Sequence, residues 1–216
     1  MSKHIPFYSN TPDDTHCYQA VLRMVLKHFL PESEYTWEEL DKFTAKKEGL
    51  WTWPTQSFMN LLNLGFDVID MDDMDNKKFI EEGGKYLINK YGKEVGEKQI
   101  ERSDIEQEIR LMKEYEKYGK HKIQIPTFEM TKEFLDQGYL VVCNINAYKL
   151  NDKPGYAGHF VVIYDYDNKN IHLHDPGLPA LESRIVTYEQ FKKAWDYPDE
   201  NARNLMAFRL INQPKD

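Results

Sequence analysis

The chain changes character at Gly138, and this change restricts the possible folds more than any other feature of the sequence. Before Gly138, apolar residues recur at helical spacing, as they do around Val21, Met24 and Val25. After it, residues 139–174 contain short runs rich in β-branched and aromatic residues, separated by turn signals. Helices followed by antiparallel strands predict an α+β fold.

The length and composition are those of one folding unit. The chain has 216 residues, of which 41% are apolar and 13% aromatic, so it can bury a core without a metal or a disulfide. We therefore expect a single domain over residues 1–216. The formal net charge of -8 would repel a phosphate backbone, so nucleic acid is not an expected partner.

Two cysteines, Cys17 and Cys143, occur in a sequence that shows no sign of export. Residues 1–6 contain no apolar signal-peptide core. The longest apolar runs, such as residues 139–143, are far too short to span a bilayer. We expect a soluble, cytoplasmic protein with no membrane partner, in which a thiol is free or catalytic rather than paired. No feature of the sequence predicts an oligomeric state.

Two charged segments interrupt the apolar pattern. Residues 76–120 are rich in Lys and Glu, contain no Pro and include the capping sequence Ser103-Asp104-Ile105-Glu106. We expect a charged helical insertion there. The acidic stretch from Asp67 to Asp75 lacks the ligand spacing of a calcium-binding loop. We interpret it as a solvated turn at the end of a short strand over residues 66–71.

Cys17 lies where the first predicted helix begins, after the cluster Asp13-Asp14-Thr15, which can cap a helix. A helix N-terminus offers unpaired N–H groups and a partial positive charge, and both stabilise a thiolate, the nucleophilic form of cysteine. Because buried, unreactive cysteines are common, position alone also fits an ordinary core cysteine. The helix should be central and buried, since its apolar stripe is broad, and Pro31 should end it.

His159 and Asp175 strengthen the catalytic interpretation of Cys17, because they lie at the open end of a predicted hairpin. The antiparallel register that matches Val161 with Leu173 also places His159 opposite Asp175 on one face. A slip of two positions would still leave them within diagonal reach. A carboxylate beside an imidazole would hold the ring and stabilise its charged form. Each residue alone has a structural explanation, but together with Cys17 they favour chemistry.

These segments resemble a known family. The stretch that begins Gly158-His159 and the stretch His174-Asp175-Pro176-Gly177 are similar to the second half of the bacteriocin-leader-processing (double-glycine) peptidases and their papain-like relatives. In that family a catalytic His opens an apolar strand, an Asp or Asn before Pro closes the next, and a Cys opens a helix. The resemblance implies Cys17, His159 and Asp175 as the triad. It also implies a papain-like cysteine protease fold, with an N-terminal helical part around a central buried helix and a C-terminal antiparallel sheet.

Two positions depart from the family pattern. The family usually has Gly directly after the cysteine, where this chain has Tyr18, and a Gln six residues before it as oxyanion donor, where this chain has Thr11. Asn10 has the amide chemistry of the missing Gln, so we predict that it is the catalytic oxyanion donor, with Gln19 as the alternative. Gln19 and Gly158 are also candidate substrate-binding residues.

The residues together predict a cysteine hydrolase, with peptidase activity foremost. His159 would take the proton from Cys17, the thiolate would attack an amide or ester carbonyl, and water would hydrolyse the thioester. The substrate would be a peptide or a small acyl or amide compound, and no cofactor is expected. An acyltransferase on the same scaffold and a non-catalytic peptide-binding module are the alternatives. No metal site is expected, since His172 and His174 have no matching third ligand.

Overall fold

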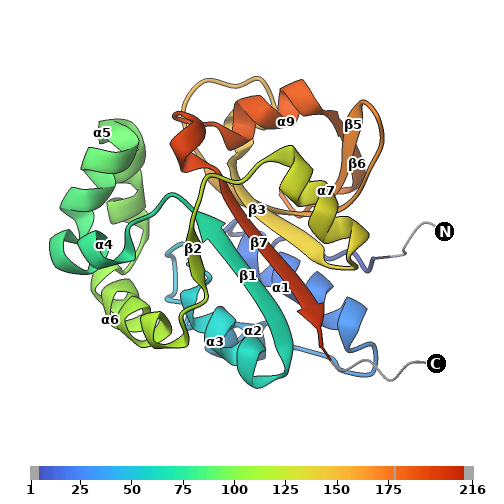
Figure 1. The fold of residues 1–216 in the computed structure, drawn as a ribbon, viewed down its shortest axis with the longest axis horizontal. Coiled ribbons are helices and arrows are strands. Elements are labelled where there is room, and N and C mark those ends of the chain that lie inside the picture. Colours follow the sequence, from blue (N-terminus) through green and yellow to red (C-terminus); the bar gives the residue numbers. More distant parts are fainter. Residues whose placement is uncertain (1–4, 178, 212–216) are drawn as a thin grey trace.

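The computed structural model describes residues 5–177 and 179–211 and shows a seven-stranded sheet flanked by helices (Figure 1). The strand order is β2-β1-β7-β3-β4-β5-β6, and each neighbouring pair is antiparallel except β1 with β2. The strands are β1 (Phe66–Asp72), β2 (His121–Ile123), β3 (Leu140–Asn146), β4 (Gly158–Tyr166), β5 (Asn170–Asp175), β6 (Leu181–Thr187) and β7 (Asn204–Leu210). The predicted α+β class is confirmed, although β2 and β6 lie in segments for which no strand was predicted.

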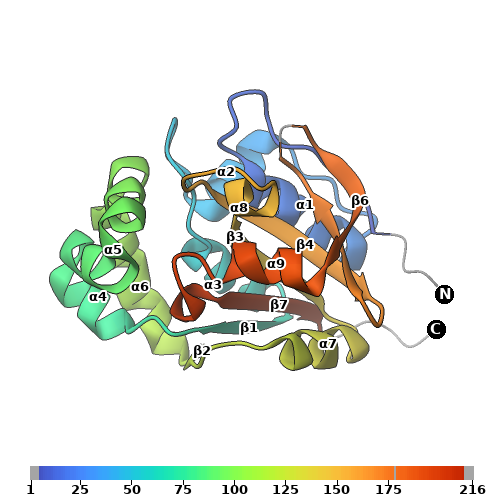
Figure 2. The same cartoon turned by 90° about the horizontal axis from the view of Figure 1, so that it is seen from above.

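The helices cover both faces of the sheet, with α1 on one face and α7 and α9 on the other (Figure 2). Their bounds are α1 (Cys17–Phe29), α2 (Trp37–Thr44), α3 (Thr55–Asn63), α4 (Asn76–Glu82), α5 (Gly84–Arg102), α6 (Ile105–Tyr115), α7 (Phe128–Asp136), α8 (Ala147–Leu150) and α9 (Tyr188–Trp195). This arrangement encloses one apolar core on each side of the sheet.

α1 is the central buried helix that the sequence predicts. Val21, Val25 and Leu26 are 0% exposed, and the helix packs against β4 and β7. Burial of one large aliphatic side chain stabilises a fold by about 1.5–3 kcal/mol. The several buried side chains of α1 therefore contribute strongly to the stability of the core on that side of the sheet. It ends at Phe29, shortly before Pro31, as predicted.

Alternation of side chains along β3 and β4 supplies both cores. Val142 and Val162 belong to the core that contains α1. Val141 and Cys143 belong to the opposite core, together with Phe191 of α9. Cys143 is 0% exposed and forms no disulfide, in agreement with its prediction as a core residue.

The hairpin of β4 and β5 differs from the expected register. Ile163 pairs with Leu173, so the strands are shifted by two positions from the register that matched Val161 with Leu173, and a bulge follows Ile163. The shift keeps the same side chains on the same face, which is why apolar matching alone did not distinguish the two registers. His159 and Asp175 are therefore diagonal neighbours rather than directly opposite.

Residues 76–118 form the helices α4, α5 and α6 and a final 3-10 turn, which together make the lobe on the left of Figure 1. Asp104 caps α6 by accepting a hydrogen bond from the Gln107 N–H at 3.0 Å, and α6 packs against α3. α5 is broken at Gly92, where φ is +78°. That the α4–α6 lobe is an insertion into the fold stays a prediction.

Within residues 5–177 and 179–211, we find no helix with the length and apolar character to cross a membrane.

The acidic stretch from Asp67 to Asp75 is not the solvated turn that we expected. β1 extends through it to Asp72, and Asp70 is only 9% exposed. The reason is tertiary, because β1 lies inside the sheet between β2 and β7 and its alternate side chains face the core. Asp75 has a local role, since it caps α4 by accepting from the Lys78 N–H at 3.1 Å.

Candidate active site

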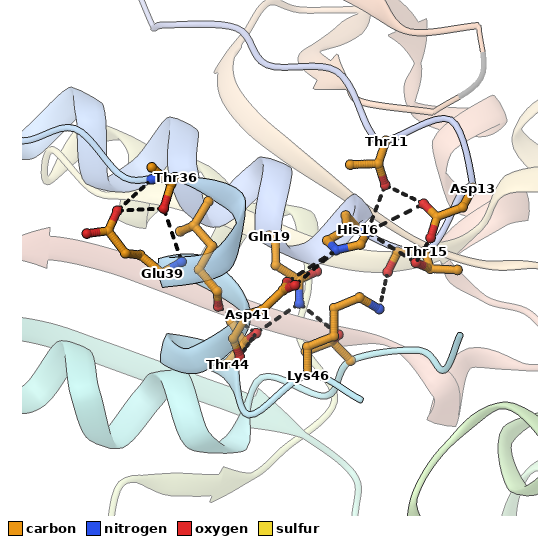
Figure 3. Close-up of polar contacts among 12 residues, drawn as sticks. Thr11, Asp13, Thr15, His16, Gln19, Thr36, Glu39, Asp41, Thr44 and Lys46 are labelled. Carbon is orange, nitrogen blue, oxygen red and sulfur yellow. Dashed lines mark hydrogen bonds and ion pairs between the residues drawn. The ribbon is translucent and has the colours of Figure 1, made fainter. Parts of the chain in front are cut away.

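α1 begins at Cys17, and a polar network holds the loop that leads into it (Figure 3). His16 Nε2 lies 3.2 Å from Asp41 Oδ1 of α2, and the Lys46 ammonium donates to the Thr15 carbonyl at 3.0 Å. The Lys46 ammonium is also near enough to Cys17 for the two charges to interact. A cation in that position favours a thiolate.

Asn10 ties together the loops that flank the two halves of the site. Its Oδ1 accepts from the His16 N–H at 2.8 Å, its Nδ2 donates to Asp14 at 2.8 Å, and its backbone N–H donates to the Pro176 carbonyl at 2.7 Å. One of its two amide hydrogens is therefore committed, and the other is the one that an oxyanion could use. The prediction that residues 13–15 cap α1 is wrong. His16 is the N-cap residue of α1, and its N–H donates to the Asn10 side chain.

Gln19 does not have the freedom that an oxyanion donor needs. Its side chain is 0% exposed, and its Nε2 donates to the Thr44 hydroxyl at 2.8 Å (Figure 3). The same Nε2 donates to the Thr52 hydroxyl at 2.8 Å. An amide nitrogen has two hydrogens, and both are used. The structure therefore argues against Gln19 as the alternative donor or as a substrate contact, and gives it the role of joining α1 to α2 and the segment after it.

His159 and Asp175 meet at the open end of the β4–β5 hairpin. His159 Nε2 lies 2.7 Å from Asp175 Oδ1, so the diagonal placement still allows a direct hydrogen bond. The two residues are 6% and 4% exposed. The imidazole is also close enough to Cys17 for the two groups to interact, and since Nε2 is engaged with Asp175, Nδ1 is the ring nitrogen left for the thiol. The structure thus brings together the three residues that the sequence singled out.

Burial and the mutual interactions of His159 and Asp175 shift the pKa of each residue in opposite directions. Burial disfavours the charged imidazole, but its hydrogen bonds to Asp175 and Cys17 prevail and raise the pKa of His159 above its ordinary 6.5, to about 10. Burial also disfavours the Asp175 carboxylate, but the His159 hydrogen bond and charge prevail and lower its pKa to about 2. An imidazolium held by a carboxylate is suited to stabilise a neighbouring thiolate.

Arg184 and Gly177 complete the surroundings of Asp175, and neither was predicted as a site residue. Arg184 Nη1 donates to Asp175 Oδ2 at 2.8 Å. The Gly177 N–H donates to Asp175 Oδ1 at 3.0 Å, and a Cβ on Gly177 would lie 2.9 Å from the same oxygen. The Pro176-Gly177 dipeptide is a visible turn signal in the sequence. No local signal marks Arg184, because it comes from β6.

Comparison with known proteins identifies the family of the chain. A model of the peptidase C39-like family matches residues 2–202, which is nearly the whole chain. The chain belongs to the peptidase C39-like family. The predicted resemblance is therefore confirmed. A comparison with curated proteins finds no match.

Two solved structures show the same fold as this member of the C39-like family. The peptidase domain of Streptococcus ComA, a bi-functional ABC transporter involved in a quorum-sensing pathway, is 15% identical and has a TM-score of 0.52, over 97% of this chain and 100% of that one. A C39-like peptidase from Bacillus anthracis is 14% identical with a TM-score of 0.52, over 99% of this chain and 97% of that one. They confirm the predicted papain-like fold.

Cys17 lies on the wall of a cavity of about 170 Å³, whose lining includes several aromatic rings. Gly158 also lines the cavity, and a Cβ there would lie 3.0 Å from the Tyr156 hydroxyl and 3.6 Å from the Trp51 ring. The α4–α6 lobe of this C39-like chain contributes Leu87, Tyr91 and Tyr115, among others. The lobe and the body of the protein therefore build the cavity together.

Proposed function

We propose that the chain is a cysteine peptidase in which Cys17 is the nucleophile, His159 the general base and acid, and Asp175 the residue that orients His159. The observation that carries this proposal is the buried His159 imidazole, which hydrogen-bonds Asp175 and interacts with Cys17 at the N-terminus of α1. A nucleophile in contact with a base, and a base held by a third group, is the arrangement that activates a cysteine. Membership of the C39-like family supports the same reading.

The reaction would proceed through an acyl-enzyme. The thiolate of Cys17 attacks the carbonyl carbon of the scissile amide, and the carbonyl oxygen becomes an oxyanion. His159 gives its proton to the leaving amine, the C–N bond breaks, and a thioester remains on Cys17. His159 then takes a proton from water, the hydroxide attacks the thioester, and the acid product leaves as Cys17 regains its thiol or thiolate form.

The oxyanion would be stabilised by donors at the start of α1. The backbone N–H of Cys17 belongs to the first turn of the helix, where N–H groups have no intrahelical partner. The uncommitted amide hydrogen of Asn10 is the second candidate donor. Lys46 adds a positive charge near the sulfur. Each hydrogen-bond donor of this kind is worth about 100- to 1000-fold in rate.

The aromatic lining of the cavity favours a peptide that carries a large apolar side chain beside the scissile bond. Trp51, Trp53 and Tyr91 line the space that Cys17 also faces, and such rings bind apolar groups by contact area. Because Tyr91 comes from α5, the α4–α6 lobe would take part in substrate choice.

A fluorogenic peptide panel tests the proposal. The panel varies the residue before the scissile bond and includes ester substrates, and activity is compared between the wild-type chain and Cys17→Ala. Cys143→Ala is the matched control, since Cys143 is the second free cysteine and lies in the core. We expect cleavage that Cys17→Ala and His159→Ala abolish and Cys143→Ala retains. Intact-mass analysis after rapid quenching should detect the acyl group on Cys17.

Other outcomes identify the alternatives. Transfer of the acyl group to an added amine, in preference to water, would show an acyltransferase. Binding of peptides by Cys17→Ala, with no turnover by the wild-type chain, would show a peptide-binding module. Turnover that survives Cys17→Ala would overturn the proposal.

A further inference from the structure

A second group of reactive side chains lines the cavity that Cys17 faces. Asp70 and Asp72 lie on β1, and His121 lies on β2 directly beside Asp70 in the parallel pairing. Asp70 and Asp72 share one face of β1 because side chains alternate along a strand. One ligand atom from each of the three residues lies within 4.8 Å of the others. It is the one such group of three within residues 5–177 and 179–211.

The spacing of these atoms suits a single metal ion. His121 Nε2 lies 2.9 Å from Asp72 Oδ1. Nitrogen and oxygen ligands bind zinc at about 2.0–2.2 Å, so two adjacent ligands of one ion lie about 3 Å apart and two opposite ligands about 4 Å apart. His121 and Asp72 are thus already at the separation of two adjacent ligands, and Asp70, whose ligand atom lies within 4.8 Å of both, needs at most a small shift to join them.

Burial makes a cation the natural complement of this group. Asp70 is 9% exposed and the His121 side chain 7% exposed. The Asp72 side chain beside Asp70 is 24% exposed; two neighbouring carboxylates repel each other, and a buried charge such as that of Asp70 is costly unless it is paired or binds a metal. His121 pairs with Asp72, so Asp70 is the carboxylate without a cation of its own in the group.

Tyr115 gives an independent indication of a ligand. This residue of α6 is 1% exposed, and its hydroxyl lies beside the Asp70 carboxylate. The hydroxyl nevertheless makes no hydrogen bond of regular geometry with any residue that the structure describes. A buried hydroxyl without a well-formed hydrogen bond is unusual, and Tyr115 lines the same cavity as the three candidate ligands.

We propose that Asp70, Asp72 and His121 bind one divalent transition-metal ion, with Tyr115 donating to a metal-bound water or to Asp70. One imidazole and two carboxylates suit Zn²⁺, Mn²⁺ or Fe²⁺, whereas Ca²⁺ and Mg²⁺ prefer oxygen ligands alone. Three protein ligands leave coordination positions open, and these would face the cavity. This site differs from the expectation of no metal, and it does not depend on the proposed peptidase activity.

Titration of the chelator-treated 216-residue chain with Zn²⁺ and Co²⁺ tests the site. Calorimetry with Zn²⁺ should show one ion per chain, and Co²⁺ should give visible absorption bands of a low-symmetry site without a thiolate charge-transfer band. Asp70→Asn, Asp72→Asn and His121→Gln should each weaken binding by at least about 100-fold, since loss of even an outer partner costs about 10- to 100-fold.

Two matched controls make the result specific. Asp73→Asn changes the next carboxylate, which pairs with Lys90 at 3.0 Å, and should leave metal affinity unchanged. Cys17→Ser should do the same, because the ion is proposed to bind away from the thiol. Circular dichroism of each variant checks that it is folded, and the three ligand variants test the site independently of one another.

Three results would overturn the assignment. The first is the absence of binding by Zn²⁺, Co²⁺ and Mn²⁺ at millimolar concentration to the folded wild-type chain. The second is binding that Cys17→Ser removes and Asp70→Asn keeps, which would place the ion at the thiol. The third is Asp70-dependent binding of hexylammonium without metal binding, which would make the group a pocket for a cationic substrate group.

Discussion

Asp175→Asn tests whether the buried ion pair is built as the structure shows. Asp175 accepts hydrogen bonds from His159 Nε2 at 2.7 Å, the Gly177 N–H at 3.0 Å and Arg184 Nη1 at 2.8 Å. An amide that keeps its oxygen toward His159 and Gly177 must turn its NH₂ group toward Arg184. Two donors would then face each other where the native side chain is only 6% exposed. A flipped amide would move the same conflict to His159.

The expected loss in free energy of unfolding follows from these contacts. Removing one partner of a buried ion pair costs about 3–5 kcal/mol, and an unmade buried hydrogen bond costs about 1–3 kcal/mol. Because asparagine keeps one acceptor oxygen, Asp175→Asn should lie near the lower limit, at about 3 kcal/mol. Asp175→Ala keeps no acceptor and should lie near the upper limit, at about 5 kcal/mol.

The loss should also depend on pH. The folded-state pKa of His159 is about 10, above its ordinary 6.5, so its contribution to stability is complete below pH 6.5 and is lost as the pH rises through 10. The folded-state pKa of Asp175 is about 2, below its ordinary 3.8, so its contribution is complete above pH 3.8 and is lost as the pH falls through 2. The difference between wild type and variant should be greatest between about pH 4 and 6.5. It should shrink above about pH 10, where only the mismatch with Arg184 persists.

Urea unfolding followed by tryptophan fluorescence measures the difference in free energy of unfolding between wild type and variant. The measurement is made at about pH 5.5 and again above about pH 10. Arg184→Gln serves as the partner in a double-mutant cycle, because it replaces a guanidinium that can only donate with an amide whose oxygen can accept from the new NH₂ group. The double variant should lose less stability than the two single variants together. A loss below about 1 kcal/mol at about pH 5.5, or a loss above about pH 10 that equals the loss at about pH 5.5, would refute the reasoning.

Three further predictions follow from the same geometry. Iodoacetamide at about pH 6 should modify Cys17 far faster than Cys143, whose pKa is raised by burial; equal rates by mass spectrometry would contradict the assignment of the nucleophile. Gly177→Ala should lower kcat/KM by about 100-fold, because its Cβ would displace the Asp175 carboxylate; unchanged kinetics would show that the contact is not essential. Tyr91→Ala should alter substrate preference in the peptide panel while Glu97→Ala, exposed on the same helix, does not; equal effects would place the lobe outside substrate choice.

Local patterns in the sequence determined the parts of the fold that depend on neighbouring residues. The apolar period of residues 21–29 predicted a buried central helix, and α1 is that helix. The alternation of β4 and β5 placed His159 and Asp175 on one face. Parity along a strand survives a shift of two positions, so the pair was predictable although its register was not.

Tertiary structure alone decided which distant residues meet. Arg184 reaches Asp175 only because β6 lies beside β5, and His121 reaches Asp70 only because β2 pairs in parallel with β1. Gln19 has both amide hydrogens occupied because α1 packs against α2. Spacing along a chain fixes which face of an element a side chain occupies. Which elements become neighbours depends on burying all their apolar faces together, and that is settled only when the whole chain has folded.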